Sequence, residues 1–93
     1  MIELRWSNES LDDLDRIDTF NQARGERWTE RVQARIGERC VSLVTLPRQG
    51  VPIGRDSRKL SIPDIQYVVI YKATPDAIVI QRIYSTRQDR TDR

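Results

Sequence analysis

The sequence predicts an α+β fold in which an N-terminal helical hairpin packs on one face of a small antiparallel sheet. Two amphipathic, helix-like stretches follow one another with only a short break at Gly25. Three runs rich in β-branched and aromatic residues fill the second half of the chain. One alternating strand precedes the helices, so the predicted order is strand, helix, helix, strand, strand, strand. The length of 93 residues allows a single domain, residues 1–93.

The first strand and the first helix have separate signals. Apolar residues alternate with charged ones from Ile2 to Trp6, which is typical of a strand with one buried face. Ser7 is placed to cap a helix, because its hydroxyl can accept a free N–H of the first turn. The helix is predicted from Asn8 to Ala23. Its predicted apolar stripe consists of Leu11, Leu14, Ile17 and Phe20.

The second helix carries the strongest periodic pattern in the chain. Pro47 ends it, because proline cannot continue the hydrogen-bond ladder of a helix. Cys40 lies in line with the other apolar residues, so we expect a buried, unreactive thiol. The apolar positions are spaced by three and four residues: Trp28, Val32, Ile36, Cys40, Leu43 and Val44.

The second half is predicted to be a loop followed by three strands. Residues 47–56 contain glycines and prolines and are interpreted as the loop. Strands are predicted at 58–62, 66–72 and 77–84, with a tight turn at Thr74-Pro75-Asp76 between the last two. Residues 86–93 are polar and charged, and we expect this tail to fray. The sheet face opposite the helices is expected to be open or only partly covered.

The composition excludes several kinds of site. The chain has no histidine, which removes imidazole bases and imidazole metal ligands. It has one cysteine, so no internal disulfide and no cysteine-rich metal cluster can form. We therefore expect no metal and no cofactor. The N-terminus lacks a signal-peptide pattern and no apolar run is long enough to cross a bilayer, so the sequence predicts a cytoplasmic protein without membrane partners.

Charge is distributed unevenly along the chain. Residues 1–46 hold seven basic and nine acidic side chains, whereas residues 47–93 hold nine basic and five acidic ones. The excess of positive charge in the second half suits an anionic partner, although a solvated arginine-rich surface explains it equally well. On the second helix, arginines recur every four residues, and we expect them to pair with the acidic residues of the first helix. They are Arg27, Arg31, Arg35 and Arg39.

The candidate functional residues lie in the last strands. The set predicted to form a binding surface consists of Arg58, Lys59, Arg82, Tyr84 and Arg87. Without histidine, RNA cleavage would need a lysine base, an arginine on the phosphate and a tyrosine acid, and Lys59, Arg87 and Tyr84 would fill these roles. A protein-binding surface accounts for the same residues, so both interpretations stay open and no catalytic residue is assigned.

Several stretches together resemble the RelE/ParE superfamily of toxins from type II toxin–antitoxin systems. Trp6 to Leu14 is similar to that family's strand end, serine cap and Asp-Leu helix. Leu46 to Pro52 is similar to its Pro-x-x-Gly-x-Pro linker, and Arg58-Lys59-Leu60 to the start of its second strand. Residues 67–83 resemble its terminal hairpin, and residues 83–89 its closing segment.

The resemblance implies a toxin that a cognate antitoxin neutralises. RelE-like members cut messenger RNA on the ribosome, and ParE-like members inhibit DNA gyrase. The residues favour the ParE branch, because Val68 stands where RelE-like enzymes have an arginine, and Ser85 where many members have a histidine. Arg87 matches an arginine that helps to hold the phosphate in RelE-like members. Ribosome-dependent mRNA cleavage remains the second alternative, and a non-toxic interaction module the third.

Overall fold

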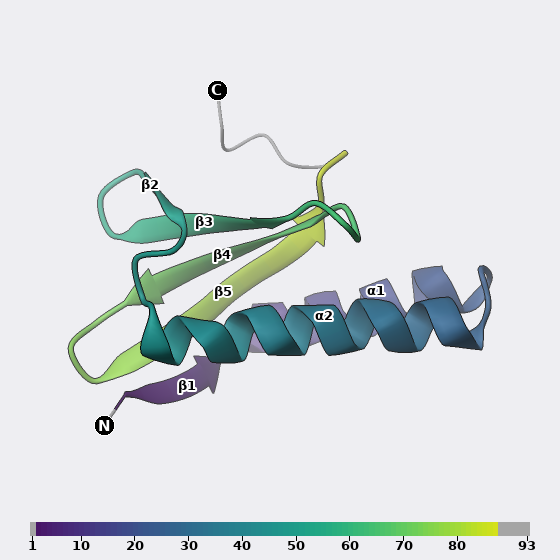
Figure 1. The fold of residues 1–93 in the computed structure, drawn as a ribbon, viewed down its shortest axis with the longest axis horizontal. Coiled ribbons are helices and arrows are strands. Elements are labelled where there is room, and N and C mark those ends of the chain that lie inside the picture. The colour runs from purple at the N-terminus through teal and green to yellow at the C-terminus, as the bar shows by residue number, and fades with distance from the viewer. Residues whose placement is uncertain (1, 88–93) are drawn as a thin grey trace.

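The computed structural model describes residues 2–87 and contains two helices and five strands (Figure 1). The predicted fold class and the order of the predicted elements are confirmed. Thr86 and Arg87 form a turn after the last strand, and the rest of the predicted frayed tail, residues 88–93, lies outside the described residues. In chain order the elements are β1 (Glu3–Trp6), α1 (Asn8–Gln22), α2 (Glu26–Thr45), β2 (Val51–Ile53), β3 (Ser57–Ile62), β4 (Tyr67–Ala73) and β5 (Ala77–Ser85).

The five strands form one sheet in the order β1-β5-β4-β3-β2. Strands β3 to β5 pair antiparallel, as predicted, and β2 pairs antiparallel with β3. Strand β1 pairs parallel with β5, from Glu3 beside Ala77 to Trp6 beside Ile80. The reason is topological: β1 is connected to the rest of the sheet through both helices, and a connection of that length does not impose the antiparallel direction of a hairpin.

Strand β2 corrects the prediction of a continuous loop from 47 to 56. Val51 to Ile53 pairs with the start of β3, where Val51 lies beside Lys59 and Ile53 beside Ser57. Pro52 made this stretch resemble a loop, because proline has no N–H for a ladder. At the edge of a sheet that loss costs little, since one side of the strand has no neighbour.

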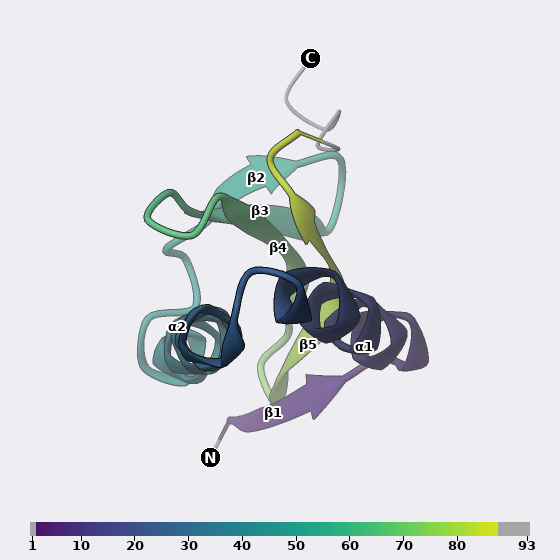
Figure 2. The same ribbon diagram turned by 90° about the vertical axis from the view of Figure 1, so that its right-hand side faces the viewer.

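The two helices are antiparallel and pack on the same face of the sheet. Figure 2 looks nearly along the helix axes and shows α1 and α2 side by side, with β3 and β4 above them. Helix α2 contributes four core side chains at the predicted spacing: Val32, Ile36, Cys40 and Leu43. From the sheet, the residues buried against the helices include Leu60, Ile62, Val69, Tyr71, Ile78, Ile80 and Ile83. Between residues 2 and 87 there is no helix with the length and apolar character needed to span a bilayer.

Helix α1 buries a face that only partly matches the predicted one. Of the predicted apolar stripe, Ile17 is buried and Leu14 packs half-buried against the core, whereas Leu11 is 47% and Phe20 68% exposed. The buried positions are Ser10, Asp13, Ile17 and Asn21. Helix α1 lies along β5 and therefore covers backbone polar groups of that strand as well as apolar side chains. Polar residues of α1 are needed there to form hydrogen bonds with these backbone groups.

Asn21 connects the two helices to the sheet. Its side-chain amide donates to the hydroxyl of Tyr67 on β4 at 3.0 Å and to the carbonyl of Ile17 at 2.8 Å. Its oxygen accepts from the indole N–H of Trp28 on α2 at 2.8 Å. One buried amide therefore joins three elements at the end of the hairpin where the two helices meet.

Candidate functional site

The sheet face that points away from the helices is closed at its centre. Val68 and Ile70 alternate with core residues of β4 and so point to this face, yet they are only 1% and 7% exposed. The strand register places Lys59, Ile70 and Arg82 in one row and Val68 beside Tyr84 in the next. Of the two expected alternatives, an open or an only partly covered face, the open one is therefore wrong for these central positions.

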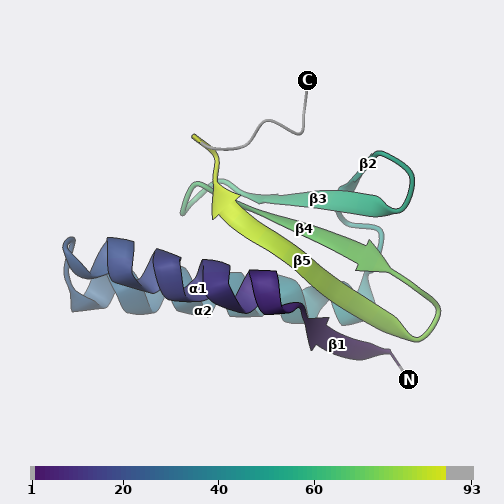
Figure 3. The same ribbon diagram turned by 180° about the vertical axis from the view of Figure 1, so that it is seen from behind.

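A groove of about 770 Å³ lies between α1 and the end of β5. Figure 3 shows α1 in front, with the tip of β5 rising away from it. Apolar and aromatic side chains form much of the lining, together with four charged residues. The lining residues are Asp13, Asp15, Arg16, Ile17, Thr19, Phe20, Tyr67, Arg82, Ile83, Tyr84 and Ser85. A groove of this composition suits a partner with an apolar face and polar flanks.

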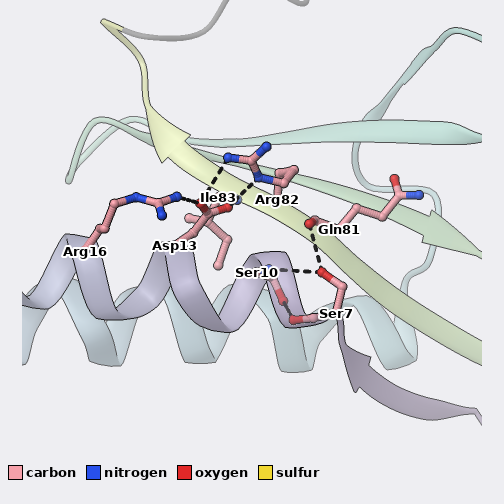
Figure 4. Close-up of polar contacts among 7 residues, drawn as sticks. All are labelled: Ser7, Ser10, Asp13, Arg16, Gln81, Arg82 and Ile83. Carbon is pink, nitrogen blue, oxygen red and sulfur yellow. Dashed lines mark hydrogen bonds and ion pairs between the residues drawn. The ribbon is translucent and has the colours of Figure 1, made fainter.

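Asp13 has hydrogen-bond partners on both α1 and β5 at the groove (Figure 4). Its carboxylate is 2% exposed and accepts from Arg82 Nε at 2.8 Å and Arg82 Nη2 at 3.1 Å. It also accepts from the backbone N–H of Ile83 at 2.8 Å and from the guanidinium of Arg16. Hydrogen bonding to Asp13 raises the pKa of the Arg82 guanidinium, so this arginine stays charged.

Ser7 fixes the start of α1 against the same strand. Its hydroxyl accepts from the backbone N–H of Ser10 at 3.0 Å, which confirms the predicted N-cap. The same hydroxyl donates to the carbonyl of Gln81 on β5 at 2.9 Å. Gln81 lies at an irregularity where the pairing with β4 shifts by one residue, between Ile70 opposite Arg82 and Tyr71 opposite Ile80.

Two of the predicted site residues come together at the groove. The guanidinium of Arg82 lies 5.6 Å from the centre of the Tyr84 ring, within reach of a cation–π interaction. Both residues line the groove. Lys59 lies in the same row as Arg82 but on β3, two strands away, which corresponds to roughly 10 Å between backbones.

Arg58 and Arg87 lie elsewhere. Arg58 alternates with Lys59 and points to the opposite side of β3, where it donates to the carbonyls of Gly50 at 2.7 Å and Arg48 at 3.5 Å. These bonds anchor the segment that leads into β2. Arg87 is exposed in the turn after β5. The structure therefore separates the five predicted residues into a pair at the groove and three residues at other positions.

The arginines of α2 have a different partner from the predicted one. Arg35 binds Asp64, in the turn between β3 and β4, through Nε at 2.8 Å and Nη2 at 3.2 Å. Arg31 lies 3.6 Å from the same carboxylate. The hydrogen bond from Arg35 lowers the pKa of Asp64. For these two arginines the predicted pairing with the acidic residues of α1 is wrong, because the β3–β4 turn lies beside their face of α2.

The sequence analysis missed Asp13 and Phe20 as groove residues. Asp13 is one of five acidic residues of α1 and looks like part of its solvated side. The available signal was the spacing of Ser10, Asp13, Ile17 and Asn21, which repeats every three or four residues and marks one helix face. In residues 2–87 no three cysteine, aspartate or glutamate side chains gather as a cation site. The groove offers recognition by apolar contact and by fixed cations.

Comparison with known proteins assigns the chain to a family. The family model described as the ParE toxin of the type II toxin–antitoxin system, parDE, matches residues 4–90. This match includes every helix and almost the whole of β1 to β5.

The chain belongs to the ParE toxin family.

A relative is similar to this chain in sequence, and a solved structure is similar to it in fold. The ParE-family chain is 30% identical over 87 residues to the protein Y4kP of Sinorhizobium fredii, covering 91% of this chain and 90% of the relative. A structure described as the chromosomal ParDE toxin–antitoxin system from P. aeruginosa contains a chain of the same fold. That chain superposes with a TM-score of 0.78 at 21% identity, over 91% of this chain and 96% of the other. The family places this chain among the toxins of type II toxin–antitoxin systems.

Proposed function

We propose that this ParE-family toxin inhibits bacterial growth by acting on DNA gyrase and that a cognate antitoxin neutralises it in the cytoplasm. The observation that carries the proposal is the match to the ParE toxin model over residues 4–90, nearly the full chain. Gyrase inhibition is the activity that the resemblance to the ParE branch implies.

The arrangement of β4 supports the ParE activity over RNA cleavage. Val68 occupies the position at which the resemblance implies an arginine in RelE-like enzymes, and it is 1% exposed. A buried valine has no group that binds a phosphate.

The groove between α1 and β5 is the surface that we assign to the antitoxin. An amphipathic segment would place apolar side chains against Phe20 and Tyr84 and an acidic side chain near Arg82. Backbone groups of β5 at this edge already bind Ser7 and Asp13. We therefore expect the segment to bind through its side chains.

Controlled expression from a tightly repressed promoter tests the activity. DNA damage with filamentation is the expected result, since it indicates gyrase. Immediate arrest of translation with cut transcripts would instead support the ribosome-dependent endoribonuclease, with mRNA and the ribosome as partners. Normal growth at a verified protein level would support the non-toxic interaction module.

An assay with purified components separates the two toxic activities directly. The ParE proposal predicts no cleavage of naked RNA by the isolated chain, with or without divalent metal. It also predicts no cleavage of messenger RNA on added ribosomes. Robust ribosome-dependent cleavage would overturn the gyrase proposal.

A further inference from the structure

We propose that Asp13 is a positioning residue for the α1–β5 groove: its carboxylate takes the place of a neighbouring strand beside the end of β5 and holds Arg82 at the groove wall. The hydrogen bonds of Asp13 lie within this chain and do not depend on a partner. Their consequence for binding an antitoxin segment rests on the proposed function.

The first step concerns the edge of β5. Strand β1 pairs with β5 only as far as Trp6 beside Ile80, so the remaining residues of β5 have no strand on that side. An unpaired edge leaves backbone groups that need partners or attract another strand. Helix α1 begins just after Trp6, and two of its side chains meet this requirement. Ser7 donates to the carbonyl of Gln81, and Asp13 accepts from the N–H of Ile83.

The second step concerns Arg82. Oδ2 of Asp13 accepts from both Ile83 N and Arg82 Nε, and Oδ1 accepts from Arg82 Nη2. One carboxylate therefore fixes two successive residues of β5: the backbone of Ile83 and the side chain of Arg82. A bidentate pair also fixes the plane of the guanidinium, which otherwise turns freely at a surface. Arg82 is then held above the Tyr84 ring, on the wall of the groove.

Burial distinguishes Asp13 from the other acidic residues of α1. Its side chain is 2% exposed, while its partners Arg16 and Arg82 are 65% and 45% exposed. A carboxylate is buried only where hydrogen bonds and opposite charge replace the water it loses. Asp12, the preceding residue, is exposed and does not line the groove, so it provides a matched control.

Amide hydrogen exchange tests the inference without any ligand. In Asp13→Leu we expect the Ile83 amide to exchange at least tenfold faster, because the N–H loses its acceptor. Asp13→Asn should retain partial protection through its amide oxygen, and Asp12→Leu should match the wild type. The amides of Val69 and Ile78, in the core strands, should change much less. Equal acceleration of all slow amides would mean that Asp13 only contributes to global stability and would overturn the proposal. So would unchanged exchange at Ile83.

A double-mutant cycle tests whether Asp13 acts through Arg82. The affinity for the cognate antitoxin is measured for Asp13→Asn, Arg82→Gln and the double variant. We expect each single variant to bind about tenfold more weakly and the double variant no more weakly than either. Additive losses would overturn the positioning role. A wild-type chain that binds no antitoxin would contradict the proposed function, while the exchange at Ile83 would still decide the role of Asp13.

Discussion

Gly50 occupies a position where no larger residue fits. A Cβ atom there would lie 2.8 Å from the carbonyl oxygen of Lys59 and 2.8 and 2.9 Å from the ring and hydroxyl of Tyr71. The Tyr71 hydroxyl accepts from Gly50 N at 2.9 Å and donates to the carbonyl of Pro47 at 2.7 Å. The close approach is thus part of the hydrogen bonding that holds the segment between α2 and β2.

We predict that Gly50→Ala lowers the free energy of unfolding by about 1–3 kcal/mol, because the added methyl group overlaps with buried atoms. Gly37→Ala is the matched control, since a Cβ at Gly37 meets nothing within 4 Å and lies inside α2. It should stabilise the protein by about 0.5–1 kcal/mol. Urea denaturation measures both. A Gly50→Ala protein as stable as the wild type would contradict the prediction.

Cys40 is predicted to be inert in the folded protein. Burial raises the pKa of its thiol from 9.0 to about 12, and the side chain is fully buried. A thiol reagent at pH 8 should label Cys40 only at the rate of unfolding. The raised pKa favours the neutral thiol in the folded state, so this contribution to stability is complete below pH 9 and is lost as the pH rises toward 12. Rapid labelling of the native protein would contradict this prediction.

Arg87 is predicted to act in toxicity and not in stability. It is exposed after the last strand, so Arg87→Glu should leave the melting temperature nearly unchanged. Under the proposed function the same change abolishes growth inhibition. Arg93→Glu changes the net charge equally, at a position outside the described residues. If both variants remain toxic, or if both weaken toxicity equally, Arg87 has no specific role.

At the scale of elements, helix α1 has one residue that we expect to contribute to stability and another that we expect to contribute to binding. Ile17 is 6% exposed and belongs to the core, so Ile17→Ala should cost about 2–5 kcal/mol in thermal or chemical unfolding. Phe20 is 68% exposed and lines the groove, so Phe20→Ser should change stability by less than about 0.5 kcal/mol. Under the proposed function Phe20→Ser weakens antitoxin binding, which calorimetry measures. Full affinity in this variant would remove Phe20 from the binding surface.

At the scale of the whole molecule, the antitoxin should stabilise the toxin by mass action. A ligand that binds only the folded state adds about 2.7 kcal/mol at one hundred times its dissociation constant. Thermal melts with and without a peptide from the antitoxin's C-terminal segment test this. We expect a clear rise in melting temperature with peptide concentration. Equal melting temperatures at saturating peptide would contradict the prediction.

The sequence was sufficient for those parts of the fold that depend on local pattern. The spacing of Val32, Ile36 and Cys40 predicted the buried face of α2, and alternation predicted β1. The density of β-forming residues on both sides of a proline-containing turn predicted the β4–β5 hairpin. The order of elements also carried the resemblance to the toxin superfamily, and the family comparison confirms that resemblance. These features depend on the spacing of apolar residues and on prolines and turn residues. Such signals determine the structure of only a few neighbouring positions, so they can be found in the sequence itself.

Only the tertiary structure decided which polar residues matter. Asp13 is buried and Leu11 exposed because α1 lies along an edge of β5 whose backbone groups need partners. Arg31 and Arg35 pair with Asp64, and not with the acidic residues of α1, because the β3–β4 turn, far away in the sequence, lies beside α2 in the fold. A one-dimensional pattern records how apolar a residue is, but the partner of a polar group is set by whichever segment the fold brings next to it.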